Sequence, residues 1–204
     1  MGSMFIGGFT ATEEDLEKLE ELGVKDSKKL SDKKRERLRG ELGDLGEVFL
    51  VEFTASKIDD LRDVMSLNEI ELKGFAEVVD RAEPDEVFMD LPEPDGDRFI
   101  GKVQELMKTD IDLEFTAEHG ADETFPIVSA ASIVAKSARE SHVEELHRKY
   151  GYDFKSGYPH DKPTIQFLKK HLQEKGRLPE ETRESWSTAQ RIIDESNQKD
   201  LSRF

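Results

Sequence analysis

Short apolar runs and longer amphipathic segments follow one another along the chain, and they predict strands and helices in turn. Runs rich in apolar, β-branched or aromatic residues predict strands at residues 4–9, 48–53, 86–90 and 113–116. Segments with apolar residues three and four apart predict helices at residues 13–22, 31–42, 67–79, 97–107, 129–150, 163–175 and 186–196. Strands therefore alternate with helices as far as residue 150, and helices alone follow.

This order of elements predicts an α/β fold with a helical C-terminal part. A length of 204 residues suits one domain with a small appendage. We expect residues 1–150 to form the main domain and residues 151–204 to form a helical subdomain. No segment repeats along the chain, which argues against a repeat architecture.

The composition is strongly acidic. Asp and Glu number 46 against 30 Lys and Arg, which gives a net charge of −16. Net charge governs solubility and long-range fields rather than a particular site. The net charge therefore does not exclude a nucleic-acid ligand, provided that cations gather locally around the phosphates. An acidic surface also suits adaptation to high salt, where ions screen its self-repulsion.

Several missing features narrow the chemistry. The chain has no cysteine, so disulfides, thiolate metal sites and cysteine nucleophiles are excluded, and a reducing cytoplasm is the expected compartment. No apolar run reaches the ~18 residues of a membrane span, and the first residues lack the pattern of a signal peptide. The sequence holds no Walker-type phosphate loop, no strand followed by GxGxxG, no HExxH and no G-x-S-x-G elbow.

Two aspartates are the first candidates for chemistry. Asp90 ends an otherwise apolar predicted strand, and open α/β sheets bind ligands at the carboxyl ends of their strands. Its carboxylate suits a hard divalent cation, although a solvated strand end has the same pattern. Asp122 lies between Gly120 and the apolar run at residues 125–128, where it either joins the same site or caps a loop.

Tyr158 and four cations are candidates for contact with a ligand. Tyr158 lies between a glycine and a proline, where its ring is either a surface residue or a stacking partner for a sugar or base. Lys136 and Arg139 are three residues apart, so they share a helix face that meets either a phosphate or acids of the same helix. Lys28 and Lys29 are neighbouring cations in an acidic chain.

A set of motifs runs along the chain in a fixed order. They are Asp26-Ser27-Lys28-Lys29-Leu30, Leu67-Asn68-Glu69, Asp90, His119 to Asp122, Phe125-Pro126-Ile127-Val128-Ser129-Ala130-Ala131-Ser132-Ile133-Val134-Ala135-Lys136, Ser156-Gly157-Tyr158-Pro159 and Trp186. In order and spacing these motifs resemble ribonuclease HII over residues 4–190, nearly the whole chain. The most specific part is the stretch at residues 125–136 with Asp122 ahead of it. The single-chain form resembles the archaeal branch of that family, and the acidic composition suits a salt-loving source.

The resemblance implies a ribonuclease H-like mixed sheet flanked by helices, and a metal-dependent endonuclease. Such an enzyme hydrolyses the RNA strand of RNA/DNA hybrids and nicks DNA 5′ of single embedded ribonucleotides. In the family four carboxylates bind two Mg²⁺ or Mn²⁺ ions, and Asp90 and Asp122 match the third and fourth of them. Two cations ~3.5–4 Å apart can activate a water and stabilise the leaving oxygen.

The resemblance also implies the contacts with the substrate. Tyr158 matches the tyrosine that packs on the ribose and helps to detect its 2′-hydroxyl. Lys136 and Arg139 match basic positions near the scissile strand, and Lys28 and Lys29 lie in a loop that approaches the nucleic acid. We expect a monomer. The C-terminal residues 200–204 are either a contact for a sliding clamp or a frayed tail.

The family pattern includes a segment that the 204-residue sequence does not hold. A strand followed by Asp-Glu-Ala-Gly-(Arg/Lys)-Gly-Pro should precede residue 4 and supply the first two carboxylates, and a late start codon or a deliberate truncation would explain its absence. We expect the strands at residues 4–9 and 86–90 to lack their shared neighbour. The alternative function is therefore a catalytically inactive remnant that at most binds nucleic acid. A different metal nuclease, or an acidic interaction module, is a third hypothesis, against which the strings at residues 125–136 and 156–159 argue.

Overall fold

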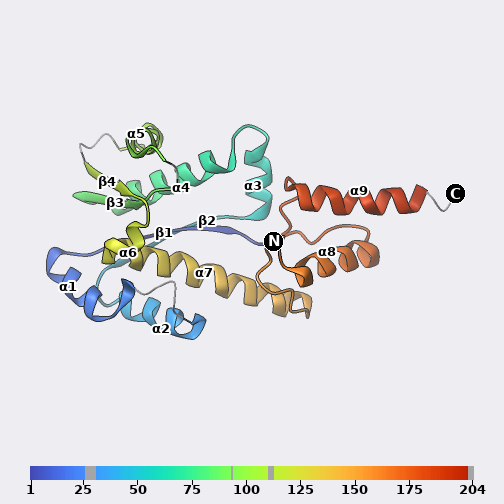
Figure 1. Cartoon of the computed structure of the whole chain (residues 1–204), viewed down its shortest axis with the longest axis horizontal. Coiled ribbons are helices and arrows are strands. Elements are labelled where there is room, and N and C mark those ends of the chain that lie inside the picture. The colour runs from blue at the N-terminus through green and yellow to red at the C-terminus, as the bar shows by residue number, and fades with distance from the viewer. Residues whose placement is uncertain (26–30, 93, 110–112, 202–204) are drawn as a thin grey trace. The chain divides into compact units, whose positions relative to one another are not determined.

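The computed structural model describes residues 1–25, 31–92, 94–109 and 113–201 (Figure 1). Strands alternate with helices as far as residue 150 and helices follow, so the predicted α/β class is confirmed. Of the described helices, none is both long and apolar enough to cross a membrane. In chain order the elements are β1 (Met4–Thr10), α1 (Glu13–Glu21), α2 (Asp32–Leu42), β2 (Glu47–Phe53), α3 (Ala55–Arg62), α4 (Leu67–Ala82), β3 (Glu86–Asp90), α5 (Gly96–Leu106), β4 (Glu114–Glu118), α6 (Ala121–Thr124), α7 (Pro126–Tyr150), α8 (Lys162–Lys175) and α9 (Ser187–Leu201).

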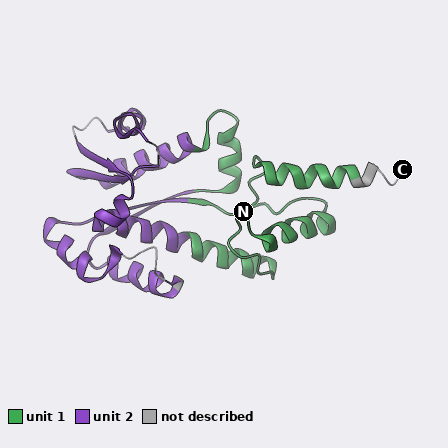
Figure 2. Cartoon of the chain, in the orientation of Figure 1, with its two compact units in different colours: residues 1–4, 53–67, 139–204 green, residues 5–52, 68–138 purple. Residues whose placement is uncertain are grey.

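The described residues form two compact units, which Figure 2 shows in different colours. Unit 1 consists of residues 1–4, 53–67 and 139–204. Unit 2 consists of residues 5–52 and 68–138. The two units are interleaved along the chain, so they do not test the expected division at residue 150, which stays a prediction.

Unit 2 contains the paired strands, apart from the end residues Met4 and Phe53, which belong to unit 1. β1 pairs with β2 in one two-stranded sheet, and β3 pairs with β4 in another. The β3–β4 pair is parallel, with Glu86 opposite Glu114 and Asp90 opposite Glu118. Since α5 connects the two strands as a crossover helix, their carboxyl ends meet at the same edge of the sheet. This edge is where Asp90 lies.

β1 packs closely against two helices. Gly7 and Gly8 face opposite sides of the strand, because successive residues of a strand point to opposite faces. A Cβ atom at Gly7 would lie 2.4 Å from the carbonyl oxygen of Ala131 in α7, and one at Gly8 would lie 2.3 Å from Cγ1 of Val78 in α4. Side chains do not approach so closely. Glycine at both positions therefore lets α7 and α4 pack directly on the two faces of β1.

Two apolar clusters stabilise unit 2. The first joins β1, α1, α2 and α7 through buried residues that include Phe9, Leu19, Leu38, Leu42, Ile133 and Val134. The second joins α4, β3 and α5 through Leu72, Val79, Val87, Met89, Phe99 and Val103. Each large apolar side chain that is fully buried contributes about 1.5–3 kcal/mol. The clusters thereby fix β3 and α7, which carry Asp90 and Lys136.

Unit 1 has a core of stacked aromatic rings. Phe167 of α8 stacks on Tyr152 and Phe154, with ring centroids 5.3 and 5.2 Å apart. The hydroxyl of Thr164 donates a hydrogen bond of 2.7 Å to the carbonyl of Phe154. This core holds the chain on both sides of the loop at residues 156–159. Aliphatic side chains from α7, α8 and α9 complete it: Val143, Leu146, Leu168 and Ile192.

Candidate functional site

Asp90 ends β3 and is held in place by the turn that follows β4. Its Oδ1 accepts hydrogen bonds from the backbone N–H of Gly120 at 2.9 Å and of Ala121 at 3.2 Å. The parallel pairing makes this contact possible, because it places Glu118 opposite Asp90. Gly120 adopts φ +68°. This left-handed conformation is energetically unfavourable for a residue that has a Cβ atom. The two backbone donors fix the direction of the Asp90 carboxylate.

Asp122 belongs to the same turn. It lies in α6, directly after Ala121, whose N–H binds Asp90. Its side chain is buried, with the whole residue 4% exposed. Lys136 of α7 places its Nζ 3.8 Å from Oδ2 of Asp122. Unit 2 therefore brings Asp90, Asp122 and Lys136 together at one edge of the β3–β4 sheet.

The two aspartates offer the carboxylate oxygens that a hard divalent cation prefers. Mg²⁺ is commonly held by one or two carboxylates, while waters and substrate phosphates complete its shell. Within the described part of the chain, no three His, Asp or Glu side chains form a group that could hold a metal ion. The donor set fits one divalent ion at Asp90 and Asp122. By itself it does not fit the two-ion site that the resemblance implies.

Tyr158 lies in a loop of unit 1 that its own hydrogen bonds shape. The backbone N–H of Ser156 donates to Oδ2 of Asp161 at 3.0 Å, and the Ser156 hydroxyl donates to the same oxygen. The hydroxyl hydrogen bond is the main reason that the pKa of the Asp161 carboxyl lies below its usual value. Gly157 turns the chain at φ +76°. The loop presents Tyr158 with 43% of the residue exposed.

Arg139 and His160 position the Tyr158 ring. The Cζ atom of Arg139 lies 5.1 Å from the ring centroid, and the His160 ring stacks on Tyr158 with centroids 5.6 Å apart. Nη2 of Arg139 donates to the carbonyls of Ser156 at 2.7 Å and Met1 at 3.3 Å. Burial lowers the pKa of the Arg139 guanidinium, and the contact with Tyr158 offsets part of this effect. Arginine nevertheless stays charged.

The structure gives the predicted cations different partners. Lys136 and Arg139 were expected to act on one helix face, yet Lys136 pairs with Asp122 and Arg139 contacts the Tyr158 loop. Their contact with a phosphate stays a prediction. Lys28 and Lys29 lie outside the described residues. Sequence reasoning missed His160, although its position two residues after Tyr158 was a usable signal.

Solved structures share this fold. The structure of a PCNA:RNase HII complex from Archaeoglobus fulgidus gives a TM-score of 0.84 at 34% identity, and the match covers 94% of this chain and 90% of that one. The ribonuclease H2 from Pyrococcus horikoshii gives a TM-score of 0.85 at 32% identity, with 94% and 98% covered. A Bst-RNase HIII in complex with Mn²⁺ is only 17% identical at a TM-score of 0.79, and shows the fold alone. The chain thus has a ribonuclease H-like fold, which confirms that expectation.

Sequence comparison narrows this class to one family. The family model described as Ribonuclease HII matches residues 1–189. The ribonuclease HII of Methanothrix thermoacetophila is 43% identical over 193 residues, which cover 94% of this chain and 90% of the relative. That of Methanosarcina barkeri is 40% identical over 205 residues, with 96% and 90% covered. The chain belongs to the ribonuclease HII family and is an enzyme of the ribonuclease class.

Proposed function

We propose that this chain is a metal-dependent endonuclease. It hydrolyses the RNA strand of RNA/DNA hybrids and nicks duplex DNA on the 5′ side of single embedded ribonucleotides. The meeting of two carboxylates at one turn carries the proposal: Asp90 accepts hydrogen bonds from the backbone that leads directly into Asp122. Carboxylate oxygens are the ligands that Mg²⁺ and Mn²⁺ prefer, so two carboxylates brought to one turn suit a divalent cation.

The residues of unit 2 would have different roles at the scissile phosphate. Asp90 and Asp122 would hold Mg²⁺ or Mn²⁺, which supplies an activated water and charge stabilisation for the leaving oxygen. The N–H groups of Gly120 and Ala121 keep the Asp90 carboxylate aimed, so no reorientation is needed when substrate arrives. Lys136 adds a positive charge beside Asp122 and is the nearest candidate for a contact with the phosphate.

Tyr158 would supply the selectivity for ribonucleotides. Its exposed ring offers a flat surface to the ribose, and the 2′-hydroxyl is the group that separates RNA from DNA. Arg139 would hold this ring in the position that the contact with the ribose requires. Lys28 and Lys29 would bind backbone phosphates, which adds affinity without adding selectivity.

One observation favours a second function for the 204-residue chain. Within the described residues, no three acids or histidines form a group that could hold a metal ion. If cleavage requires more carboxylates than those of Asp90 and Asp122, these residues bind hybrids without cutting them. A single assay that measures both cleavage and binding distinguishes the two functions.

The assay measures cleavage and binding of one labelled DNA duplex that contains a single ribonucleotide. The proposed function expects a Mg²⁺- or Mn²⁺-dependent nick 5′ of the ribonucleotide, which Asp90→Asn and Asp122→Asn abolish without abolishing binding. Glu114→Gln is the matched control, because Glu114 begins β4 at the opposite end of the same strand pair. Binding without a nick by the unaltered chain supports the second function. Unchanged turnover in Asp90→Asn overturns the first.

We further propose that the enzyme acts as a monomer in the cytoplasm and docks on a sliding clamp. The solved relative from Archaeoglobus fulgidus is described as a complex with PCNA. The C-terminal residues 200–204 end in Phe204, an aromatic side chain of the kind that fills pockets at interfaces. Residues 202–204 lie outside the described part of the chain. Calorimetric titration with an archaeal clamp should show binding that Phe204→Ala removes.

A further inference from the structure

Lys155 lies just before the loop that carries Tyr158, and its backbone adopts a conformation that lysine rarely takes. Its φ is +65°, in the left-handed region that a residue with a Cβ atom disfavours. Of the described residues other than glycine, only Glu83 shares a positive φ, at +45°. Such a conformation persists only where the surrounding structure holds it. Lys155 therefore requires contacts that fix its backbone from outside.

Two side chains bind both backbone groups of Lys155. Its N–H donates to Oδ1 of Asp153 at 2.9 Å, and its carbonyl lies 3.0 Å from Nε2 of His147. A carbonyl oxygen only accepts, so Nε2 of His147 must carry the hydrogen. Nζ of Lys155 also donates to Asp153, but the two side chains are 62% and 60% exposed, so this ion pair adds little. Asp153 and His147 hold Lys155 mainly through its backbone.

The core of unit 1 fixes the His147 ring. His147 lies in the last turn of α7, and its ring packs edge-on against Phe154 with ring centroids 4.4 Å apart. Phe154 is fully buried, and the side chain of His147 is only 25% exposed. A ring packed in this way has little freedom to turn. His147 therefore presents its N–H group at a fixed place, and the backbone of Lys155 has to meet it there.

The conformation of Lys155 determines the direction of the chain at Ser156. The carbonyl of Ser156 accepts a hydrogen bond of 2.7 Å from Arg139, and its N–H donates to Asp161 at 3.0 Å. A return of Lys155 to negative φ would turn these two groups away from their partners, because each backbone dihedral orients the chain that follows it. Arg139 also contacts the Tyr158 ring. The position of this ring therefore depends on the backbone of Lys155.

We propose that His147 and Asp153 are positioning residues for the recognition of ribonucleotides. They clamp Lys155 in its left-handed conformation, and Lys155 in turn orients the loop that carries Tyr158. The inference rests on the proposed function in one respect, the contact of Tyr158 with the ribose. The clamp itself is a property of the free protein and needs neither metal nor nucleic acid. His147 and Asp153 act through the loop and do not contact the substrate.

His147→Phe tests the clamp, because it keeps a ring against Phe154 and removes only the N–H that binds Lys155. We expect kcat/KM at an embedded ribonucleotide to fall roughly three- to tenfold, while binding to an all-DNA duplex stays within about twofold. His171→Phe is the matched control. Nδ1 of His171 binds the carbonyl of Arg177 at 2.9 Å, a bond of the same kind outside the Tyr158 loop. An equal loss in His171→Phe overturns the proposal.

Asp153 provides a second test of the clamp. Asp153→Ala removes the acceptor of the Lys155 N–H and should lower ribonucleotide cleavage roughly three- to tenfold. Asp153→Asn removes the charge but keeps an oxygen that accepts, so its cleavage should stay within about twofold of the unaltered chain. Equal losses in the two variants mean that the charge of Asp153 matters rather than its backbone hydrogen bond, which overturns the positioning role.

Glycine at position 155 separates backbone strain from the lysine side chain. Lys155→Gly removes the Cβ atom, so φ +65° no longer needs a clamp. His147→Phe combined with Lys155→Gly should therefore recover cleavage to within about twofold of the unaltered chain. Lys155→Ala also removes the ammonium but keeps the Cβ atom, so combined with His147→Phe it should recover nothing. Recovery in both combinations, or in neither, overturns the proposal.

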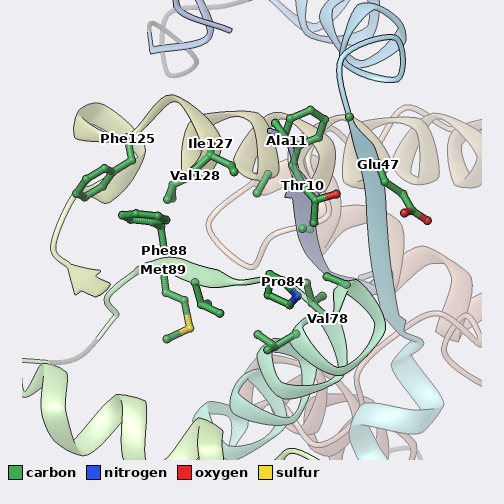
Figure 3. A pocket seen from close by; sticks show the side chains of 18 of the residues that line it. Thr10, Ala11, Glu47, Val78, Pro84, Phe88, Met89, Phe125, Ile127 and Val128 are labelled. Atoms are coloured by element: carbon green, nitrogen blue, oxygen red, sulfur yellow. The ribbon is translucent and has the colours of Figure 1, made fainter. Parts of the chain in front are cut away.

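Amide hydrogen exchange tests the clamp in the free protein, without nuclease activity. Three N–H groups within residues 155–158 are hydrogen bonded, and their exchange should become faster in His147→Phe. Residues 86–90 are the internal reference, because they belong to unit 2, where Phe88 packs against Phe125 with ring centroids 5.0 Å apart (Figure 3). Faster exchange at residues 155–158 alone supports the clamp even if the unaltered chain cleaves nothing, which would overturn only the proposed function. Unchanged exchange there overturns the clamp and leaves the proposed function standing.

Discussion

The guanidinium carbon of Arg139 lies 5.1 Å from the centre of the Tyr158 ring. The same guanidinium donates a hydrogen bond of 2.7 Å to the carbonyl of Ser156, two residues before the tyrosine. One side chain therefore holds both the aromatic ring and the backbone of its loop. Cation–π contacts contribute roughly 0.5–2 kcal/mol, and a hydrogen bond from a charged donor contributes about 1.5–3 kcal/mol. Together they are large enough to set the position of an exposed ring.

Arg139→Lys should loosen this arrangement without removing the positive charge. A lysine ammonium lacks the planar fork that reaches two carbonyls and faces a ring at once. We expect cleavage at an embedded ribonucleotide to fall roughly tenfold, a loss of about 1.4 kcal/mol in transition-state binding. Binding to an all-DNA duplex should change less than about twofold, because it depends on phosphates. Arg148→Lys on the same helix is the control, and equal losses in both assays would argue against a positioning role.

Tyr158→Ala should damage recognition of the ribonucleotide more than it damages binding. On the proposed function the ring would supply stacking worth about 1–3 kcal/mol, whereas phosphate contacts would be made by other residues. We expect cleavage of the ribonucleotide duplex to drop by one to two orders of magnitude while affinity for all-DNA duplex stays within about threefold. Tyr158→Phe keeps the ring over Arg139 and removes only the hydroxyl, so it tests 2′-hydroxyl sensing separately. Parallel losses in both assays would mark Tyr158 as structural.

Gly120→Ala should destabilise the protein, because Gly120 has φ +68° in the turn that binds Asp90. The left-handed conformation costs an alanine roughly 1–2 kcal/mol. Gly101→Ala is the matched control, since Gly101 lies inside α5 and no atom comes within 4 Å of an added Cβ. That change should raise the free energy of unfolding by about 0.5–1 kcal/mol. Urea unfolding measures the free energy of unfolding of both variants, provided that the dependence of this free energy on urea concentration is unchanged. Stabilisation by both substitutions would contradict the backbone argument.

The sequence was informative where the signal is local. Asp90 was predicted at a strand end because an apolar run precedes it, and Tyr158 was singled out by its glycine and proline neighbours. Their partners depend on tertiary structure. The bond from Gly120 to Asp90 spans 30 residues and requires the parallel pairing of β3 with β4. The bond from Arg139 to Ser156 spans 17 residues. No periodicity in the sequence encodes either contact.

One helix that was not predicted shows the same limit, whereas one misplaced helix boundary had a local signal. α3 was not predicted, because its short segment is mostly polar and buries little beyond Ile58. Contacts from elsewhere stabilise it: Asp59 accepts hydrogen bonds from the backbone N–H of Glu184 at 2.7 Å and of Ser185 at 3.0 Å. α7 was expected to begin at residue 129, yet it begins at Pro126. Proline is favoured at the first position of a helix, a start signal that the sequence did contain.

Lys136→Met should strengthen metal binding at the two aspartates while it weakens catalysis. The ammonium lies 3.8 Å from Oδ2 of Asp122 and partly neutralises the charge that attracts a cation. Its removal should tighten Mn²⁺ binding by roughly two- to tenfold, since water partly screens the half-exposed ammonium from the buried carboxylate. Asp122→Asn should weaken binding instead. Lys169→Met, which breaks an exposed pair of 2.6 Å with Glu195 in unit 1, is the control. Calorimetric titration with Mn²⁺ measures all three, and identical affinities would show that Lys136 does not act on the site.

The stability of the 204-residue chain should rise with pH between about 5 and 8. The Met1 amine is buried and donates a hydrogen bond of 2.6 Å to the carbonyl of Gly157. Burial is the main cause that lowers its pKa from 8.0 to about 5, and the charges of Arg183 and Arg139 add to the effect.

Between these two pKa values the unfolded chain binds a proton at the amine that the folded chain does not bind. The free energy of unfolding must then increase as the pH rises through this window, by up to about 4 kcal/mol. Below pH 5 both states are protonated, so this group adds no further pH dependence there. Urea unfolding at intervals from pH 5 to pH 8.5 measures the slope, with mass spectrometry to establish that Met1 is retained. The same chain acetylated at Met1 is the control, since an acetylated amine does not titrate. A flat profile in the unmodified chain, or an equal slope in the acetylated one, would show that the buried amine does not control stability.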